Sequence, residues 1–192
     1  MRTVCDKLIR RHPHVFGDVI AKDSEEVLRN WEKIKTQERL EKHENPSILS
    51  GIPDGLPPLL KANRIQGKVA HVGFDWEGDS AEPLFKKLDE EIQELKSAVN
   101  DDKINDEKDK QKIHDHISEE LGDVLFMTVN LARKLKIDPD AALSSVCEKF
   151  KKRFSLMEKF ARDENKSISD YSLEELDTFW NKAKEFLKNN PA

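Results

Sequence analysis

The chain has 192 residues, which fits one domain or one domain with a short appendage and excludes a large multidomain enzyme. Charged residues make up 37% of it, yet the formal net charge is only -5, so neither a disordered polyelectrolyte nor a binder of long nucleic acid is expected. Few glycines and prolines and a single tyrosine, beside abundant Ala, Leu, Glu and Lys, predict an all-α fold.

The cysteine content and the apolar stretches indicate in which cellular compartment the protein is expected. Two cysteines, Cys5 and Cys147, are too few for a disulfide framework, which favours a reducing, cytoplasmic compartment. The longest apolar stretch is far too short to span a membrane, and the first residues contain no apolar signal core. We therefore expect a cytoplasmic protein with no membrane partner.

The N-terminal part predicts two helices and a linker. The first spans residues 2–11 and ends there because Pro13 disfavours a helical conformation in the residue before it. The second covers about residues 24–42, with a serine at its start and acids in its first turn. Four prolines and two glycines within residues 45–58 predict a connection without regular structure. The expected division is a helical tail at 1–45, a linker at 46–58 and the main domain at 59–192.

The main domain is predicted to contain five helices, because its apolar residues recur three and four positions apart. They are expected over about residues 59–71, 80–99, 117–135, 139–161 and 172–186, with the polar run 100–112 as a solvated connection. In the 117–135 helix the apolar stripe should lie centrally in the core. It consists of Ile117, Leu121, Val124, Thr128, Leu131 and Leu135.

A weak internal repeat links the two ends of the chain. Residues 7–11 resemble residues 149–153, and residues 25–35 resemble residues 174–184, with a tryptophan and a lysine at matching places. The chain would then contain two similar pairs of helices, one near each end. The alternative is chance similarity between helices rich in Lys and Glu.

Two acidic pairs mark the candidate chemistry. Glu91 and Glu94 share one helix face, as do Glu120 and Asp123, and both pairs adjoin apolar stripes. Paired helices would bring four partly buried carboxylates together, and their repulsion is costly without a cation. Ligands that are all oxygen favour Mg²⁺, with Mn²⁺ possible and structural Zn²⁺ disfavoured. The alternative is an ordinary charged face.

The combination of motifs resembles a known family. Glu-Glu-x-x-Glu at 90–94 is followed by Glu-x-x-Asp at 120–123, with Val-Gly-Phe-Asp-Trp at 72–76 upstream and Glu-Lys-Phe-x-x-Arg-Phe at 148–154 downstream. Together these look like the MazG nucleoside triphosphate pyrophosphohydrolases. The resemblance implies a helical bundle, an intertwined homodimer, and Mg²⁺-dependent hydrolysis of nucleoside triphosphates to monophosphates and pyrophosphate. It also implies that residues 1–45 resemble the end of a preceding unit.

The resemblance also implies roles for individual residues. Its metal ligands are Glu91, Glu94, Glu120 and Asp123, and its substrate-contact positions are Lys87, Lys149, Arg153, Trp180 and Lys184. Glu90 and Glu119 adjoin the ligands and are the candidate proton acceptors. His116 stands where relatives can have lysine, which leaves its role open. Cys147 replaces an asparagine, so that one expected polar contact to the nucleotide is either missing or supplied by another residue.

The residues themselves agree with this chemistry. Lys149 and Arg153 are one helical turn apart, as are Trp180 and Lys184, so each pair presents its groups on one face. With no Walker motif, glycine-rich phosphate loop or Ser/His/Asp set in the sequence, water activated by a metal is the expected nucleophile. Two alternatives remain open. One is a noncatalytic helical adaptor, and the other is a narrower pyrophosphatase for dUTP or phosphoribosyl-ATP.

Overall fold

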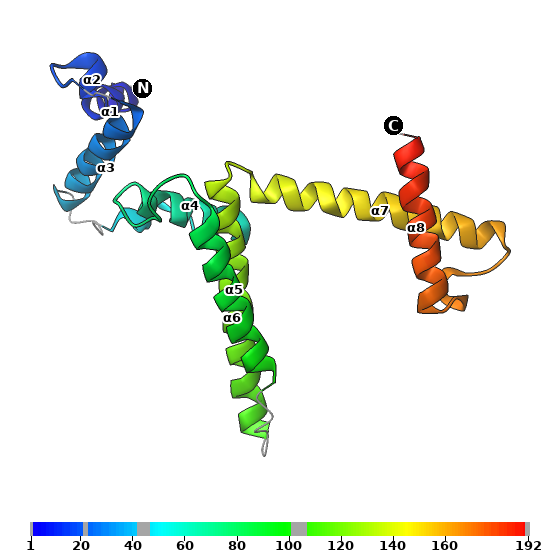
Figure 1. The fold of residues 1–192 in the computed structure, drawn as a ribbon. Coiled ribbons are helices and arrows are strands. Elements are labelled where there is room, and N and C mark those ends of the chain that lie inside the picture. The colour runs from blue at the N-terminus through cyan, green and yellow to red at the C-terminus, as the bar shows by residue number, and fades with distance from the viewer. Residues whose placement is uncertain (1, 21–22, 42–46, 101–106, 191–192) are drawn as a thin grey trace. The chain divides into compact units, whose positions relative to one another are not determined.

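The computed structural model describes residues 2–20, 23–41, 47–100 and 107–190. Contacts divide the chain into two compact units, Met1–Pro139 and Asp140–Ala192. Every regular element in the described ranges is a helix, which confirms the all-α prediction (Figure 1). The predicted domain boundary at residues 45–46 involves residues outside those ranges and stays a prediction.

The first unit contains the following elements: α1 (Arg2–Arg11), α2 (Pro13–Phe16), α3 (Ser24–Glu41), the 3₁₀ turn η1 (Ile48–Gly51), α4 (Pro58–Ala70), α5 (Glu82–Val99) and α6 (Glu107–Lys134). Helix α1 ends immediately before His12-Pro13, as predicted. The short α2 was not predicted, and it has proline in its first turn, where the missing N–H costs nothing.

A buried carboxylate joins α1 to α3. Glu38 is 7% exposed, and its two oxygens accept hydrogen bonds from Arg10 Nε at 2.7 Å and Arg11 Nε at 3.0 Å. The Arg11 hydrogen bond is the main reason why the pKa of Glu38 lies below its usual value. Arg11 also lies over the Trp31 ring, 5.7 Å from its centroid. These contacts hold α1 against α3, and the Glu38 carboxylate offsets one of the two arginine charges.

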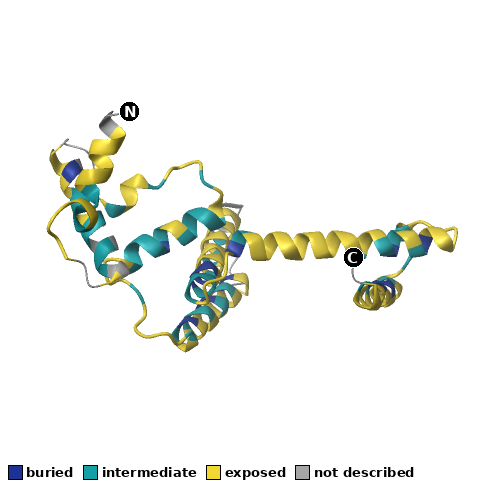
Figure 2. Cartoon of the chain, turned by 90° about the horizontal axis from the view of Figure 1, so that it is seen from above, coloured by how far each residue is buried: buried dark blue, intermediate teal, exposed yellow. Residues whose placement is uncertain are grey.

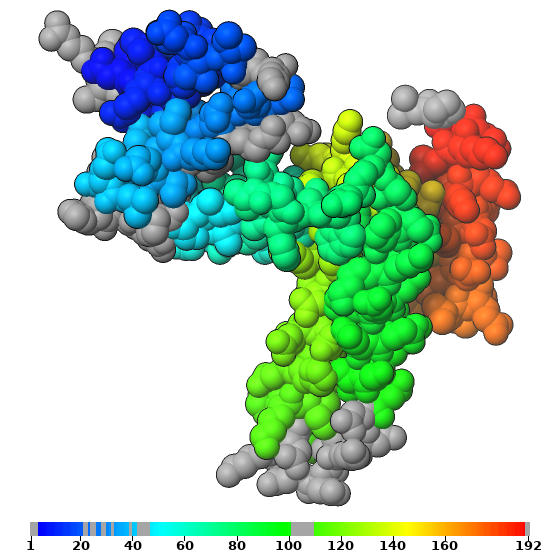
Figure 3. Space-filling view, turned by 60° about the vertical axis from the view of Figure 1, so that its left-hand side comes forward, coloured from blue at the N-terminus to red at the C-terminus, as the bar shows by residue number. Residues whose placement is uncertain are grey.

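Helices α5 and α6 form an antiparallel pair and lie side by side along their length (Figure 3). Leu84 and Ala98 of α5 are buried, as are Met127 and Val129 of α6. Helix α4 also packs on α6, and buried Gln66 donates from Nε2 to the Phe126 carbonyl at 2.7 Å. The pairing of α5 with α6 is what sets the acidic residues of the two helices opposite each other.

Two expectations for α6 are wrong. The polar run 100–112 was expected to be a connection, but α6 already begins at Glu107, while residues 101–106 lie outside the described part. Side-chain pairing one turn apart supports a polar helix, as in the 2.7 Å hydrogen bond from Gln111 to Asp115. The predicted stripe is also only partly buried, because Ile117, Val124 and Leu131 are half-buried but Leu121 is 47% exposed. The fully buried apolar residues of α6 are Met127 and Val129 instead.

The loop before α5 is tied to the C-terminal end of α6. Arg133 pairs with Asp75 at 2.6 Å, and Lys134 Nζ donates to the carbonyls of Trp76 and Gly78. Gly78 has φ of 71°, in the region that favours glycine. The contacts hold the start of α5 against α6.

The second unit is a helical hairpin with a small core. It contains α7 (Pro139–Asp163), the 3₁₀ turn η2 (Ile168–Asp170) and α8 (Leu173–Asn189). Ser172 and Glu175 form the predicted capping box at the start of α8. The core consists of Met157, Ala161, Phe179 and Ala183.

The N-terminal half of α7 is exposed (Figure 2). The stripe predicted along residues 143–161 is buried only at Met157 and Ala161. Its other end is open, with Leu143, Val146 and Phe150 all half exposed. The predicted burial of the rest of the stripe is therefore wrong within this unit. Helices α7 and α8 cover each other only where they cross, near Met157 and Ala161.

Tyr171 provides a test of the second unit, because it is the single tyrosine of the sequence. Burial, and then the 2.8 Å hydrogen bond that it donates to Glu164, raise the pKa of its phenol to about 12. We expect a titration of absorbance at 295 nm to have its midpoint near this value, about two units above that of free tyrosine.

The sign of the effect on stability follows from that pKa. The protonated phenol is favoured in the folded unit, so its contribution is complete below the pKa of the unfolded chain, about 10. It is lost as the pH rises through the folded pKa near 12. Glu164→Gln should move the midpoint only part of the way back, because burial is the larger cause. A wild-type midpoint near 10 would contradict the packing around Tyr171.

None of the helices within the described ranges combines the length and the apolar character needed to cross a membrane. Both cysteines, Cys5 and Cys147, are exposed and free.

Candidate active site

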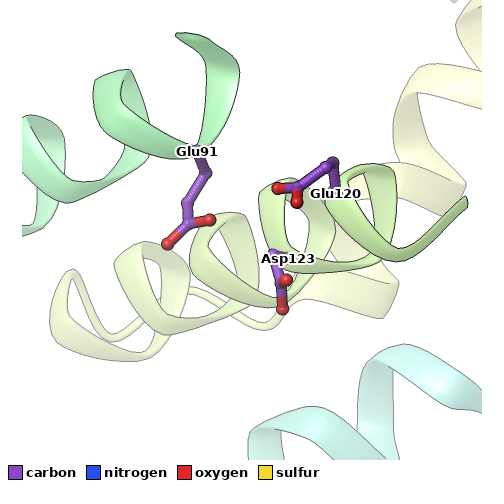
Figure 4. Close-up of side chains that lie close together, drawn as sticks. All are labelled: Glu91, Glu120 and Asp123. Carbon is purple, nitrogen blue, oxygen red and sulfur yellow. The ribbon is translucent and has the colours of Figure 1, made fainter. Parts of the chain in front are cut away.

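Three carboxylates from α5 and α6 converge in the first unit. Glu91, Glu120 and Asp123 each offer an oxygen, and these oxygens all lie within 4.8 Å of one another. Figure 4 shows Glu91 pointing from α5 toward Glu120 and Asp123 on α6. Glu91 is buried, Glu120 is half-buried and Asp123 is exposed, so the cluster opens from the helix interface to solvent. The three residues could hold a divalent metal.

The chemistry of these ligands fits a hard cation. All three donors are oxygen, and three negative charges at this separation repel one another strongly at a partly buried place. A divalent cation would relieve that repulsion while leaving coordination positions for water and phosphate oxygens. The donor set therefore matches Mg²⁺ or Mn²⁺ better than a structural zinc ion.

Glu94, the fourth predicted ligand, lies beside the cluster without belonging to the group of three. It follows Glu91 by one turn of α5 and is exposed. The negative charge of Glu91 is the main cause that raises the pKa of Glu94, and Glu120 adds to the effect. Glu94 thus feels the field of the cluster, but its carboxylate is not one of the converging oxygens.

Lys87 contacts the acidic cluster directly. Its Nζ lies 2.9 Å from Glu91 Oε1 and 3.1 Å from Glu90 Oε2. The hydrogen bond to Glu91 is the main cause that raises the pKa of Lys87. Lys87 therefore partly neutralises the cluster, and Glu90, one of the two predicted proton acceptors, is held by the same ammonium group.

Glu119, the other predicted proton acceptor, is exposed on α6 and has no ion pair within the described residues. Its neighbour Glu120 lies 3.5 Å from His116 Nδ1, one turn earlier on the helix. His116 is thus close to a cluster carboxylate, at the position where the resemblance implied a lysine. A cation at this position would contact Glu120 in the same way.

The second unit brings together two of the residues that were predicted to lie near the substrate, Arg153 and Trp180, with Phe150 beside them. The Arg153 guanidinium lies over Trp180, 5.2 Å from the ring centroid, and the Phe150 ring is 4.9 Å from the same tryptophan. Arg153 Nε is buried and has no hydrogen-bond partner among the described residues. Buried donors are normally satisfied, so this N–H is a candidate for a ligand contact.

Lys149 and Lys184 complete the predicted set in this unit. Both are exposed, on α7 and α8 respectively. Neither has an ion pair within the part of the chain that the structure describes, so both keep an uncompensated charge. The acids of the first unit and the cations of the second are thus two distinct groups of residues.

Comparison with known proteins bears on both groups. The profile of the MazG nucleotide pyrophosphohydrolase domain matches residues 79–155, which include the acidic cluster, Lys149 and Arg153. The nucleoside triphosphate pyrophosphohydrolase of Escherichia coli K12 is 39% identical over 183 residues, covering 94% of this chain and 65% of the relative. Residues 79–155 of this chain are a MazG domain.

Two other relatives extend the comparison. The nucleoside triphosphate pyrophosphohydrolase/pyrophosphatase MazG of Thermotoga maritima is 39% identical over 184 residues, covering 96% of this chain and 64% of the relative. The uncharacterized protein YabN of Bacillus subtilis is 41% identical over 186 residues, covering 96% of this chain and 35% of that protein. The chain thus spans a little less than two thirds of the length of the curated MazG relatives that it matches.

One contact in the second unit was not predicted as part of the site. Phe150 was assigned to an apolar core stripe, but its ring is half exposed and lies against Trp180. The sequence feature that indicates a role for Phe150 is its position between Lys149 and Arg153, two cations one turn apart. An aromatic residue between two such cations can extend the flat surface on which a base could stack.

Proposed function

We propose that this chain hydrolyses nucleoside triphosphates to nucleoside monophosphates and pyrophosphate with Mg²⁺ as the cofactor. The observation that carries the proposal is the convergence of Glu91, Glu120 and Asp123 inside the region that matches the MazG domain. The curated relatives from Escherichia coli and Thermotoga maritima carry the name of this activity, which supports the proposal.

The carboxylates of α5 and α6 would hold the ion. Glu91, Glu120 and Asp123 provide the inner oxygens, and Glu94 is placed to contribute through the open side of the cluster. A bound Mg²⁺ supplies positive charge to phosphate oxygens and makes water more acidic. Lys87 holds Glu91 in place and adds a cation that can face the phosphate chain.

Glu119 is the better of the two candidates for the proton acceptor. Glu90 already forms an ion pair with Lys87 at 3.1 Å, so its carboxylate is less available to a water molecule. Glu119 adjoins Glu120 in sequence and has no such partner within the described residues. Its carboxylate would accept the proton that the attacking water loses.

The second unit would bind the nucleotide. Lys149 and Arg153 present two cations on one face of α7, and negative charge grows on the phosphates as the bond to the α-phosphorus breaks. Arg153 Nε supplies a buried donor that has no partner among the described residues, while Trp180 and Phe150 provide aromatic surface for the base. Lys184 adds a cation one turn beyond Trp180.

A homodimer would bury apolar surface on α7 that a single chain leaves exposed. The half-exposed side chains of Leu143, Val146 and Phe150 form an apolar stripe that the second unit leaves open. The equivalent stripe of a second copy could cover it with matching chemistry, as in the helix bundles of symmetric dimers.

We therefore expect light scattering at micromolar concentration to give twice the chain mass of 22.2 kDa. Val146→Asp, which places a charge in the middle of the stripe, should shift the mass toward that of one chain. The control is Ser145→Asp, which introduces the same charge at the exposed neighbouring position. A wild-type mass near 22.2 kDa would contradict the dimer.

Product analysis tests the function. The chain would be incubated with each common ribo- and deoxyribonucleoside triphosphate and Mg²⁺, and the products separated. Monophosphate and pyrophosphate in equal amounts are expected. Turnover of dUTP or of phosphoribosyl-ATP alone would favour a narrower pyrophosphatase, and binding of metal without any turnover would favour a noncatalytic adaptor.

A further inference from the structure

The face of α6 that carries the acidic cluster continues into a second polar group. Glu120, Asp123, Met127 and Asn130 follow one another in steps of three and four residues, so they share one side of the helix. Asn130 lies two turns beyond Asp123, or about 10 Å along the helix axis. It is only 6% exposed, which makes it a buried polar residue that the proposed function does not use.

The Asn130 side chain orients an arginine. Its Oδ1 accepts hydrogen bonds from Arg133 Nε at 3.1 Å and from Arg133 Nη2 at 2.8 Å. The same Nη2 donates to Asp75 Oδ1 at 2.6 Å, and this oxygen also accepts from the Trp76 backbone N–H. Burial opposes the ionisation of Asp75, but the hydrogen bond and the charge of Arg133 are the main effects that outweigh it and lower its pKa. A charged pair of defined geometry therefore links the loop before α5 to α6.

This link acts close to the start of α5. Asp75 precedes the helix, which begins at Glu82, and Lys134 Nζ holds the intervening loop through the Gly78 carbonyl. Helix α5 is continuous from Glu82 to Val99. A shift of its first turn along α6 would therefore move Glu91 by a similar distance.

Apolar packing alone is poorly suited to fix that position. The buried residues of the pair are Leu84 and Ala98 of α5 and Met127 and Val129 of α6, and hydrophobic burial has no preferred direction. Hydrogen bonds, in contrast, depend on both distance and angle. A functional site requires its ligand atoms to be placed within about 0.5 Å. A directional contact that sets where α5 begins thus has consequences at Glu91.

We propose that Arg133, oriented by Asn130 and paired with Asp75, is a positioning residue for the metal site. It sets the place of α5 along α6, and through it the distance of Glu91 from the carboxylates of α6. Arg133 acts through α5 and not by contact with the ion. The inference rests on the proposed metal site, and its test separates a failure of the inference from a failure of that site.

The test is a calorimetric titration with Mg²⁺ of the wild type, Asp75→Asn, Arg133→Gln and the double variant. A long-range charge effect would weaken Mg²⁺ binding in Asp75→Asn and tighten it in Arg133→Gln, because the two changes have opposite sign. Positioning predicts that both variants bind Mg²⁺ about tenfold more weakly. The double variant, whose net charge equals that of the wild type, should lie within about twofold of the weaker single variant, because the same pair is broken in each.

Asp79→Asn is the matched control. Asp79 is exposed in the same loop and carries the same charge as Asp75, so its change should leave Mg²⁺ affinity within about twofold of wild type. Circular dichroism of the same samples measures the helix content. Should Arg133→Gln lose helix, Arg133→Lys takes its place, since it keeps the charge but lacks the planar guanidinium that contacts Asn130 and Asp75 together. A loss of about threefold or more in that variant supports the proposal, and wild-type affinity overturns it.

The remaining outcomes are equally decisive. Tighter Mg²⁺ binding in Arg133→Gln would show a long-range charge effect and overturn the proposal. Wild-type affinity in both single variants, or an equal loss in Asp75→Asn and Asp79→Asn, would also overturn it. A wild-type chain that binds no Mg²⁺ would refute the proposed metal site itself, and this inference with it, which is a different result from wild-type binding that the variants leave unchanged.

Discussion

Asp123→Asn should lower the turnover of nucleoside triphosphates by at least about a hundredfold and weaken divalent-metal binding by at least about tenfold. The change keeps the size of the side chain and removes one of the three charges that converge on the proposed ion. Asp123 is exposed, so the fold should tolerate the change. Calorimetric titration with Mg²⁺ and a turnover assay measure the two effects.

Asp115→Asn is the matched control. Asp115 is an exposed aspartate on the same helix, and its oxygen accepts a hydrogen bond from Gln111 outside the acidic cluster. The Asp115→Asn change should leave metal affinity and turnover within about twofold of wild type, as most surface substitutions do. Wild-type metal affinity in Asp123→Asn would remove that residue from the site, and an equal loss in both variants would mean that overall charge, and not position, controls binding.

Lys149→Ala and Arg153→Ala should each reduce turnover by more than about tenfold. Both cations are proposed to interact with phosphate oxygens on which charge grows as the bond breaks, so the loss should appear mainly in kcat. The Arg153 change also removes a packing contact with Trp180, so its effect should be compared with that of Arg153→Lys. The conservative variant keeps a charge but not the guanidinium geometry and should recover only part of the rate.

Lys152→Ala is the control for α7. Lys152 immediately precedes Arg153, is exposed and lies on a different face of the helix. Steady-state kinetics of the four variants would decide the assignment. A kcat of Lys149→Ala or Arg153→Ala within about twofold of wild type would show that the residue does not stabilise the transition state.

The sequence predicted most of the helix boundaries because strong local signals set them. Pro13 limits α1, Pro139 begins α7 and the Ser172 capping box begins α8, and none of these depends on packing. The polar start of α6 was missed because residue composition alone does not distinguish a solvated helix from a loop. Pairing of side chains one turn apart, such as Gln111 with Asp115, favours the helix.

Burial was harder to predict than helix position. An apolar stripe shows which face of a helix is suited to a partner but not whether the partner belongs to the same chain. Val146 and Phe150 were expected to be buried, and they are half exposed because α8 crosses α7 further along, near Met157. The same limit applies to Leu121 on α6.

The candidate metal site was largely predictable, since a spacing of three residues places two acids on one helix face. The pairing of α5 with α6 then brings Glu91 to Glu120 and Asp123. Glu94 satisfies the same spacing, yet its carboxylate lies outside the group of three. Spacing cannot separate these cases, because rotamers and the opposing helix decide which oxygens converge.

Hydrolysis in ¹⁸O-labelled water shows which phosphorus atom of the nucleotide is attacked. With Mg²⁺ and a nucleoside triphosphate, water should attack the α-phosphorus, so that pyrophosphate leaves as one piece. Mass spectrometry should then find the label in the nucleoside monophosphate and none in the pyrophosphate. Label in orthophosphate, with nucleoside diphosphate as the other product, would show attack at the γ-phosphorus and contradict this account.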